Sequence, residues 1–173
     1  IDRWLPAYFG GDDTPYTRAI GARWLISAVA RIYKPGVKAD HILILEGVQG
    51  IKKSTGLDMM FTPWFTDEIP DLGSKDAAIQ VAGVWLIELG ELDAMKRVEQ
   101  SRLKAFLARR QDRYRPPWGR HAHDFPRQCI FAGSVNPTGG YLEDPTGGRR
   151  FWPVLCQRID TDLLWHDRNQ IWA

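Results

Sequence analysis

The segment that most restricts the fold of this chain is "HILILEGVQGIKKST", residues 41–55. An uninterrupted apolar run, "ILIL", is followed by a turn that contains two glycines and then by residues that can begin a helix. Uninterrupted apolar runs are typical of strands buried on both faces, as in parallel sheets. Open α/β sheets bind ligands at the carboxyl ends of such strands. The segment therefore predicts an α/β fold with a ligand site at this turn.

The turn nearly matches the phosphate-binding pattern G-x-x-x-x-G-K-[ST], with Gly47, Lys53 and Ser54 in place and Lys52 instead of the second glycine. In such a loop the backbone N–H groups surround the phosphates, the lysine reaches the outer phosphates and the hydroxyl group binds Mg²⁺. A left-handed backbone at Lys52 would cost about 1–2 kcal/mol, which its charge beside polyphosphate can offset. From the loop alone, a nucleotide site and a chance glycine turn are equally good interpretations. The candidate nucleotide contacts are Gly47, Val48, Gln49, Gly50, Ile51, Lys52, Lys53, Ser54 and Thr55.

A second apolar run, "VWLIELGEL", ends in two glutamates, Glu88 and Glu91. Nucleotide hydrolases with such a loop need an acidic residue at the end of a neighbouring apolar strand, to hold Mg²⁺ and to orient water. We therefore assign Glu88 to the metal, together with Ser54, and Glu91 to the role of catalytic base. The alternative is that both glutamates merely cap the helix that follows. Their position, about 35 residues after the loop, favours the hydrolase interpretation.

Two later motifs can complete such a site. "IFAGSVNP" places Asn136 at the end of a third apolar run, where its amide can orient an attacking water near the outer phosphate. The alternative for Asn136 is an ordinary Asn-Pro turn. "DPTGGRRFW" presents Arg149 and Arg150, and arginine can stabilise the charge of a transferring phosphoryl group, often across a subunit boundary. Surface arginines paired with acids are an equally good alternative.

The other segments predict a sandwich of helices around a mainly parallel sheet, preceded by an N-terminal helix. That helix is expected over residues 14–33, with Thr14 as its N-cap and Pro15 in its first turn. Further helices are expected within residues 54–61, 74–83 and 93–110, and further strands within residues 83–92, 128–137 and 148–156. The 173 residues are interpreted as one domain cut from a longer protein, comprising an N-terminal helical segment (1–36), a nucleotide-binding core (37–158) and a C-terminal segment (159–173).

Charge is distributed unevenly along the chain. Ten Lys and Arg but only three Asp and Glu lie between Lys96 and Gln128, in a protein whose net charge is +2. Such a segment is expected of a nucleic-acid-binding protein, and equally of a solvated helix face followed by a basic loop. No apolar run reaches the roughly 18 residues of a membrane helix, so no membrane partner is expected. Cys129 and Cys156 lie far apart in apolar stretches, as expected of reduced thiols in a cytoplasmic protein.

Six blocks of sequence carry a resemblance to a known family. They are "YTRAIGARWLISAVARIYKPGVKADHILILEGVQGIKKST", "WLIELGELDAM", "LKAF", "DRYRPPWGR", "PRQCIFAGSVNP" and "YLEDPTGGRRFWPV", in this order. Together they resemble the virulence-associated protein E family, P-loop ATPase domains of phages, prophages and mobile islands that are similar to superfamily 3 helicases of the AAA+ class. The resemblance extends from about residue 12 to residue 154, which is nearly the whole chain.

The resemblance implies ATP and Mg²⁺ as ligands and a role in replicating mobile DNA, frequently beside a primase-like segment. By matching blocks, Lys53 and Ser54 fall on the phosphate-binding pair, and Glu88 and Glu91 on the acidic strand end. Asn136 falls on the sensor asparagine that helps to position water. The fold implied is therefore a P-loop NTPase sandwich of the AAA+/superfamily 3 type.

The arginine pair carries a further implication for assembly. Arg149 and Arg150 fall on the arginines of the family, one of which would reach the nucleotide of a neighbouring subunit in a ring or other oligomer. The chain departs from the family pattern at Lys52, where glycine is usual, and at Gly148, where asparagine is expected. The first departure concerns the rate of catalysis more than binding, and the second concerns the setting of the arginines.

A DNA contact is also implied, because superfamily 3 helicases carry a hairpin before the sensor strand that grips single-stranded DNA. "YRPPWGRHAHDFPR" occupies that place in this chain. The basic side chains expected to contact phosphates are Arg115, Arg120, His121 and His123. Tyr114 or Trp118 would stack on bases. The alternative is a hairpin packed on the core through Trp118 and Phe125, with its charges merely solvated.

The sequence thus predicts an ATP-hydrolysing motor of the DNA helicase or translocase type, cytoplasmic, encoded by a bacterium or a phage, and acting on single-stranded or forked DNA. Self-association into a ring and contacts with a primase-like segment or other replication proteins are expected. One alternative is a nucleotide-gated adaptor or switch that binds DNA and hydrolyses ATP slowly, to which Lys52 points. Another is a structural subunit of a replication complex without a competent nucleotide site.

Overall fold

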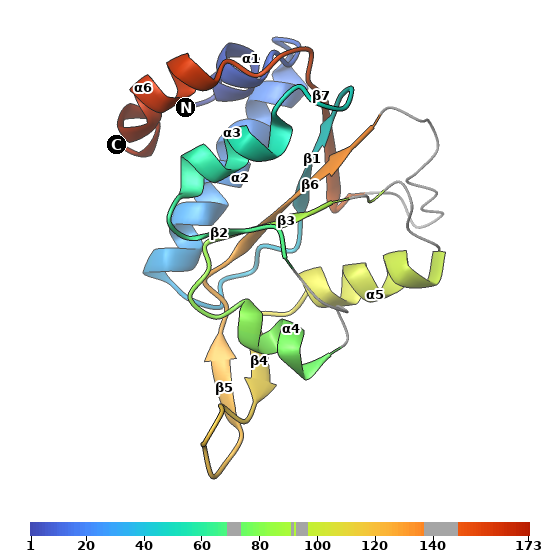
Figure 1. Ribbon diagram of the computed structural model, residues 1–173, viewed down its shortest axis with the longest axis vertical. Helices are drawn as coiled ribbons and strands as arrows, with labels where there is room; N and C mark the ends of the chain where they lie inside the picture. Colours follow the sequence, from blue (N-terminus) through green and yellow to red (C-terminus); the bar gives the residue numbers. More distant parts are fainter. Residues whose placement is uncertain (69–73, 91, 93–96, 137–148) are drawn as a thin grey trace.

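The structure, a computed structural model, describes residues 1–68, 74–90, 92, 97–136 and 149–173 (Figure 1). Its helices are α1 (Trp4–Phe9), α2 (Pro15–Tyr33), α3 (Lys53–Phe61), α4 (Lys75–Gln80), α5 (Arg97–Leu107) and α6 (Thr161–Trp172). Its strands are β1 (Ile42–Glu46), β2 (Phe65–Thr66), β3 (Leu86–Leu89), β4 (Gln111–Tyr114), β5 (His123–Pro126), β6 (Ile130–Val135) and β7 (Phe151–Leu155). The chain is therefore mixed α/β, as predicted.

Five strands form one sheet in the order β2-β3-β6-β1-β7. Every neighbouring pair in this sheet is parallel. The carboxyl ends of all five strands consequently lie along one edge of the sheet and their amino ends along the other; β6 runs from the lower left to the upper right in Figure 1. The sheet confirms the predicted parallel arrangement and puts β6 between β1 and β3, so that the three predicted motif strands are adjacent.

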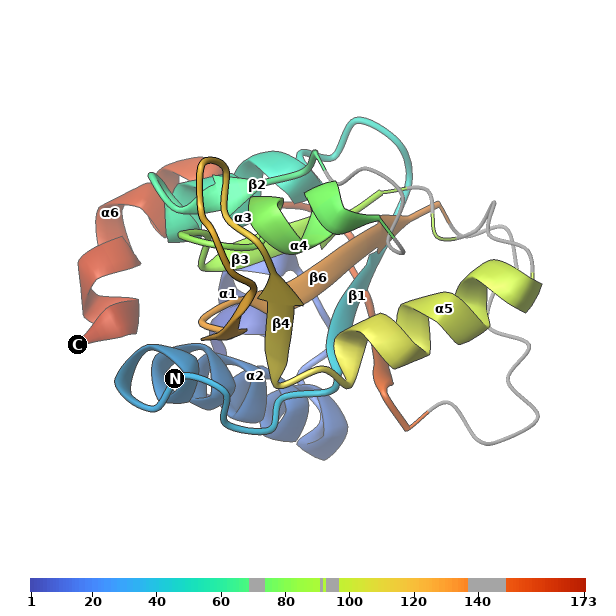
Figure 2. The same cartoon turned by 90° about the horizontal axis from the view of Figure 1, so that it is seen from below.

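Each face of the sheet is covered by its own hydrophobic core. One core joins the sheet to α1, α2, α3 and α6, with Trp24, Phe61 and Leu45 among its fully buried side chains. The other joins the opposite face to α4 and α5, with Phe106 and Phe131 at its centre. The two views in Figures 1 and 2 show these helix layers on either side of the strands. Because both faces are covered, the run "ILIL" is wholly buried, which explains its uninterrupted apolar composition.

The long helix α2 forms where the sequence predicts it. The Thr14 hydroxyl accepts a hydrogen bond from the Thr17 N–H at 3.1 Å, and Pro15 occupies the first turn, where its missing N–H has no cost. Trp24 then anchors the helix to the sheet, because its indole N–H donates to the Phe131 carbonyl oxygen at 3.0 Å. Among the described residues, no helix is both long and apolar enough to cross a membrane.

A two-stranded antiparallel hairpin, β4–β5, extends from the amino edge of the sheet immediately before β6 (Figures 1 and 2). Its base is fixed by a buried ion pair in which the Arg127 guanidinium donates to the Asp112 carboxylate, one N···O distance being 2.8 Å. Arg127 also donates to the Phe106 carbonyl oxygen at 2.6 Å and lies over the ring of that residue. The hairpin expected from residues 114–127 is therefore present, and its first strand begins earlier, at Gln111.

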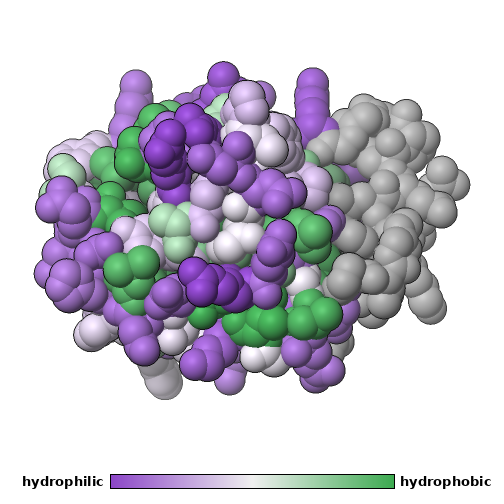
Figure 3. All heavy atoms as spheres, turned by 90° about the horizontal axis from the view of Figure 1, so that it is seen from above, coloured by the Kyte–Doolittle hydropathy of each residue, from purple (hydrophilic) through white to green (hydrophobic). Residues whose placement is uncertain are grey.

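Several features differ from the predicted elements. Helices α1 and α6 and the short strand β2 were not individually predicted, and α4 ends at Gln80, before residue 83. The predicted helix over residues 93–110 is described only from Arg97, and the parts at residues 93–96 lie outside the described residues, as do Glu91 and Gly148. Seen from above, the surface is mainly hydrophilic with separate hydrophobic groups (Figure 3).

Candidate functional site

The loop between β1 and α3 has a conformation that only certain residues allow. A Cβ atom at Gly47 would lie 2.6 Å from Ile51 Cδ1 and 2.7 Å from the Cys156 carbonyl oxygen, so this position requires glycine. Gly50 has φ +86°, which also favours glycine. Lys52 has φ 69° and ψ 33°, the left-handed region considered from the sequence. Its side chain therefore costs about 1–2 kcal/mol in backbone strain.

Lys53, the first residue of α3, is held inside this loop. Its side-chain amine donates to the Gly47 carbonyl oxygen at 2.6 Å and to the Val48 carbonyl oxygen at 3.1 Å. Burial lowers the pKa of the amine, and the nearby Cys156 and Glu88 oppose this effect. The chain thus places a buried ammonium group within the curve of the loop, where it can exchange backbone oxygens for those of a phosphate.

The loop and the acidic strand meet through one hydrogen bond between α3 and β3. The Ser54 hydroxyl donates to Glu88 Oε1 at 2.8 Å, although the two residues are 34 positions apart in the sequence. The second carboxylate oxygen, Glu88 Oε2, is buried and has no hydrogen-bond partner in the described structure. The residue as a whole is 2% exposed. The pair therefore offers a hydroxyl oxygen and a carboxylate oxygen to a cation, which is the donor set that Mg²⁺ prefers.

The environment of Glu88 favours its neutral form when nothing is bound. Burial raises the pKa of this carboxyl, while the nearby Ser134 and Ser54 hydroxyl groups lower it to a smaller extent. The negative charge of Asp67 raises the pKa further, and Lys53 lowers it. Removal from water disfavours an isolated charge, so an arriving cation would find a carboxyl group whose ionised form it stabilises.

A polar pocket of about 450 Å³ opens beside these residues. The loop, the start of α3 and the carboxyl ends of β3 and β6 line it with Gln49, Gly50, Lys52, Lys53, Ser54, Thr55, Gly90, Ser134, Val135 and Asn136. Asn136 is thus brought to the loop as predicted. The side chains of two other predicted contacts lie elsewhere, because Val48 is exposed and Ile51 packs on the hydrophobic core. Ser134 was missed, although a serine within an apolar strand two residues before Asn136 was a usable signal.

The predicted arginine pair does not join this pocket within one chain. Arg149 and Arg150 directly precede β7, at the amino edge of the sheet. The Arg150 carbonyl oxygen accepts from the Ile42 N–H at 2.7 Å, and its guanidinium Nε lies 3.6 Å from Asp40 Oδ2. β1 has five residues, so roughly 15 Å of strand separates the pair from the loop. Glu91, the predicted base, lies outside the described residues.

The hairpin exposes the basic side chains that the sequence singled out. Arg115, Arg120, His121 and His123 are all exposed. Trp118, near its tip, is also fully exposed, so the alternative in which this tryptophan packs on the core is wrong. Tyr114 is stacked on Phe125 with ring centroids 4.3 Å apart, which packs the two strands of the hairpin together and leaves Trp118 as its exposed aromatic surface.

Metal binding by side chains alone has little support in the described part of the chain. No three His, Cys, Asp or Glu side chains gather there in a group that can hold a metal ion. A cation at Glu88 and Ser54 therefore needs further ligands from water or from a phosphate. This is the usual situation of Mg²⁺, which keeps several waters and binds through one or two carboxylates together with substrate phosphates.

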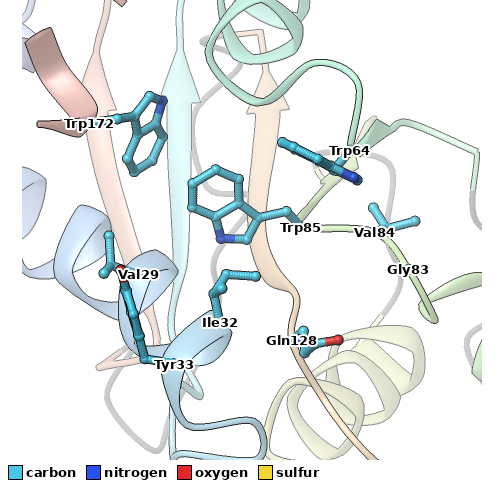
Figure 4. Close-up of a pocket in the computed structure, with 9 residues that line it drawn as sticks. All are labelled: Val29, Ile32, Tyr33, Trp64, Gly83, Val84, Trp85, Gln128 and Trp172. Atoms are coloured by element: carbon cyan, nitrogen blue, oxygen red, sulfur yellow. The ribbon is translucent and has the colours of Figure 1, made fainter. Parts of the chain in front are cut away.

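A second pocket, of about 460 Å³, lies apart from the loop, where α2 ends and β3 begins (Figure 4). Its lining is mostly apolar and aromatic, with Ile32, Trp64, Trp85 and Trp172 converging on it. The Trp85 indole N–H is already used, because it donates to the Ala28 carbonyl oxygen at 2.9 Å. None of its lining residues is charged, so this pocket is unsuited to a phosphate group.

Fold and site together define a class: a mixed α/β protein whose mainly parallel sheet carries a polar pocket at the carboxyl ends of its strands. The family can be stated more closely. Residues 1–173 match the family model of the virulence-associated protein E-like domain, and the chain belongs to that family. No curated protein matches the chain.

Solved structures extend the comparison of the fold. The apo structure of the NrS-1 C-terminal region (305–718) is similar with a TM-score of 0.64 and 17% identity, over 97% of this chain and 43% of that one. The A form apo structure of the same region gives a TM-score of 0.61 and 18% identity, over 95% of this chain and 41% of that one. This chain thus spans about two fifths of the length of the solved chains that it matches. At such low identity the likeness shows a shared fold.

Proposed function

We propose that this domain is a P-loop ATPase of the AAA+/superfamily 3 type that binds ATP with Mg²⁺ and drives movement on DNA during replication of phage or mobile-element DNA in a bacterial cytoplasm. The observation that carries the proposal is the 2.8 Å hydrogen bond from Ser54 to Glu88. It brings the helix after a glycine loop to the acidic end of a separate strand. Phosphate binding and hydrolysis need these two motifs at the same place.

In this proposal each residue of the pocket has a separate task. The N–H groups of the loop would surround the phosphates, and Lys53 would exchange its bonds to Gly47 and Val48 for bonds to the outer phosphates. Ser54 and Glu88 would hold Mg²⁺, which when bound neutralises phosphate charge and fixes the phosphate geometry. Asn136, on the edge of the pocket, would orient the attacking water.

The remaining charge on the phosphoryl group would be stabilised from a neighbouring subunit. Arg149 and Arg150 lie at the opposite edge of the sheet from the loop, so their own chain's pocket is out of reach. This geometry fits an arginine that acts on the nucleotide of a neighbouring subunit. Such an arrangement requires a ring or another oligomer. Release of Arg150 from Asp40 would then accompany assembly.

DNA would be contacted at the hairpin. Its exposed Arg115 and Arg120 can attract phosphates, and the exposed indole of Trp118 can stack on an unpaired base. These contacts do not read sequence, which suits a protein that must move along DNA. Single-stranded or forked DNA is the proposed substrate, and a primase-like segment or other replication proteins are proposed partners.

A second candidate function is a nucleotide-gated switch that binds DNA and hydrolyses ATP slowly. Lys52 favours it, because a charged side chain in a left-handed position stands where the usual loop has glycine. Such a residue can hold the phosphates firmly and slow their rearrangement. The motor and the switch differ in turnover rather than in binding.

The test is a calorimetric titration of ATP·Mg²⁺ against the wild-type protein, Lys53→Ala and the control Lys38→Ala, with phosphate release followed in parallel. Lys38 carries the same charge on an exposed side chain beside Asp40, away from the pocket. Binding with turnover in the wild type and in Lys38→Ala, both lost in Lys53→Ala, would support the motor. Binding without turnover, with and without single-stranded DNA, would support the switch. Absence of binding by the wild-type protein would reject both.

A further inference from the structure

Strand β2 brings an acidic residue to the site that the sequence did not single out. β2 pairs with β3 in parallel, Phe65 opposite Leu86 and Thr66 opposite Ile87. Asp67 directly follows β2 and Glu88 is the next residue of β3, so the same register, continued by one residue, brings these two carboxylates near each other at the carboxyl edge. Phe65 and Leu86 both pack into the core beneath α3, and side chains two residues further along a strand point the same way. The alternation therefore puts Glu88 on the sheet face that α3 covers, and continued past the end of β2 it puts Asp67 on the same side.

The electrostatics of Glu88 agree with this placement. The negative charge of Asp67 is among the causes that raise the pKa of the Glu88 carboxyl, so the two groups lie within electrostatic reach. They differ in their access to solvent, since Asp67 is exposed and Glu88 is 2% exposed. Glu88 Oε2 is buried without a hydrogen-bond partner in the described structure. A buried, free carboxylate oxygen next to a second acid is an arrangement that a cation relieves.

We infer that Asp67 is a further acidic group of the cation site, holding the water shell of a divalent cation whose inner ligands include Glu88 and Ser54. The inference rests on the proposed function, because it concerns the same site. Asp67 follows the outermost strand next to β3, so it lies on the solvent side of Glu88. Mg²⁺ retains several waters, and a carboxylate beside its inner ligands can bind the ion through them. Asp67 is a positioning residue, and its effect is on the cation rather than on the nucleotide.

The experiment separates the affinity for the cation from the affinity for the nucleotide. Binding of a non-hydrolysable ATP analogue is measured by calorimetry first with EDTA and then with Mn²⁺, for the wild type, Asp67→Asn and Glu68→Gln. The ratio of the two dissociation constants is the coupling between cation and nucleotide. Glu68 is the matched control, because it is the next residue, is also exposed and loses the same charge. Asp67 is exposed, so Asp67→Asn is expected to keep the melting temperature of the wild type.

We expect Asp67→Asn to lower the coupling about tenfold, as outer-shell partners of metal sites do, with the affinity in EDTA unchanged. Glu68→Gln should retain the wild-type coupling within twofold. Equal coupling in Asp67→Asn and wild type would overturn the inference and leave the proposed function intact. An equal loss in Glu68→Gln would also overturn it, since the effect would then be one of general charge. A wild-type protein that binds no analogue in either condition would overturn the proposed function and this inference with it.

Discussion

The two edges of the central sheet hold charge in opposite ways. At the carboxyl edge, Lys53 and Glu88 are buried and fixed by hydrogen bonds to the loop and to Ser54. At the amino edge, the hairpin presents Arg115 and Arg120 to solvent. Buried charges are screened little and act on groups held at fixed positions, whereas exposed cationic side chains attract any polyanion and are screened by salt. One molecule can therefore keep a geometrically exact site and a tolerant binding surface, separated by the length of its strands.

The largest effect is expected from a substitution of the buried Glu88 at the carboxyl edge. Glu88→Gln removes the charge that holds the cation while preserving the shape of the side chain and its contact with Ser54. We expect phosphate release to fall by about 100-fold or more, with DNA binding unchanged. Steady-state phosphate release and fluorescence anisotropy of labelled single-stranded DNA measure the two quantities. Turnover that survives in Glu88→Gln would remove this carboxylate from the proposed mechanism.

Stability provides the control for that variant. Burial raises the pKa of Glu88 in the folded protein, so the folded state binds its proton more tightly than the unfolded chain does. The wild type therefore loses stability relative to Glu88→Gln as pH rises from the unfolded pKa through the folded pKa. We expect the melting temperatures of the two proteins to be closest near pH 4 and the variant to be the more stable at pH 8. The reverse trend would mean that Glu88 is stabilised as a carboxylate.

The next effect concerns the exposed edge. Trp118→Ala should weaken binding of single-stranded DNA by about 1–3 kcal/mol if one base stacks on the indole. Arg120→Ala should lower the slope of log affinity against log salt by about 0.7, the value for one phosphate of a single strand. Anisotropy titrations at several salt concentrations measure both, with Arg3→Ala, an exposed arginine outside the hairpin, as control. Unchanged slope and affinity in the hairpin variants would place the DNA contact elsewhere.

The smallest effect concerns Lys52, an exposed charged residue at the carboxyl edge. Lys52→Gly relieves the left-handed strain but gives the unfolded chain more freedom, so the net gain in unfolding free energy should be about 1 kcal/mol or less. We expect the variant to keep ATP binding and to hydrolyse faster. Chemical denaturation and phosphate release test the two parts. Loss of nucleotide binding would show instead that the Lys52 charge is part of the phosphate grip.

Local sequence was sufficient where the structure depends on neighbours in the chain. The cap at Thr14, the buried run before Gly47 and the left-handed backbone considered for Lys52 all follow from a few adjacent residues. The order of the strands then brought Asn136 to the loop, as the family resemblance implied. These parts of the site were accessible because each motif directly follows its own strand.

Other parts of the candidate site depend on contacts between distant segments, which a short stretch of sequence cannot predict. β2 has only two residues, too few to show alternation, and its partner is identified only by the packed sheet, so Asp67 went unnoticed. In contrast, the large distance between the loop and the pair Arg149 and Arg150 could have been predicted from the topology. In a parallel sheet, residues that precede a strand lie at the opposite edge from residues that follow one, and this pair precedes β7.

Strand β6 gives the molecule a mechanical property. It begins three residues after Arg127, whose ion pair with Asp112 fixes the base of the hairpin, and it ends at the residue before Asn136. Its six residues span about 20 Å. They are hydrogen-bonded to β1 on one side and to β3 on the other, which keeps the strand extended. The pocket and the hairpin are thus joined by one continuous strand, so a shift of β6 along its axis would move both of its ends together.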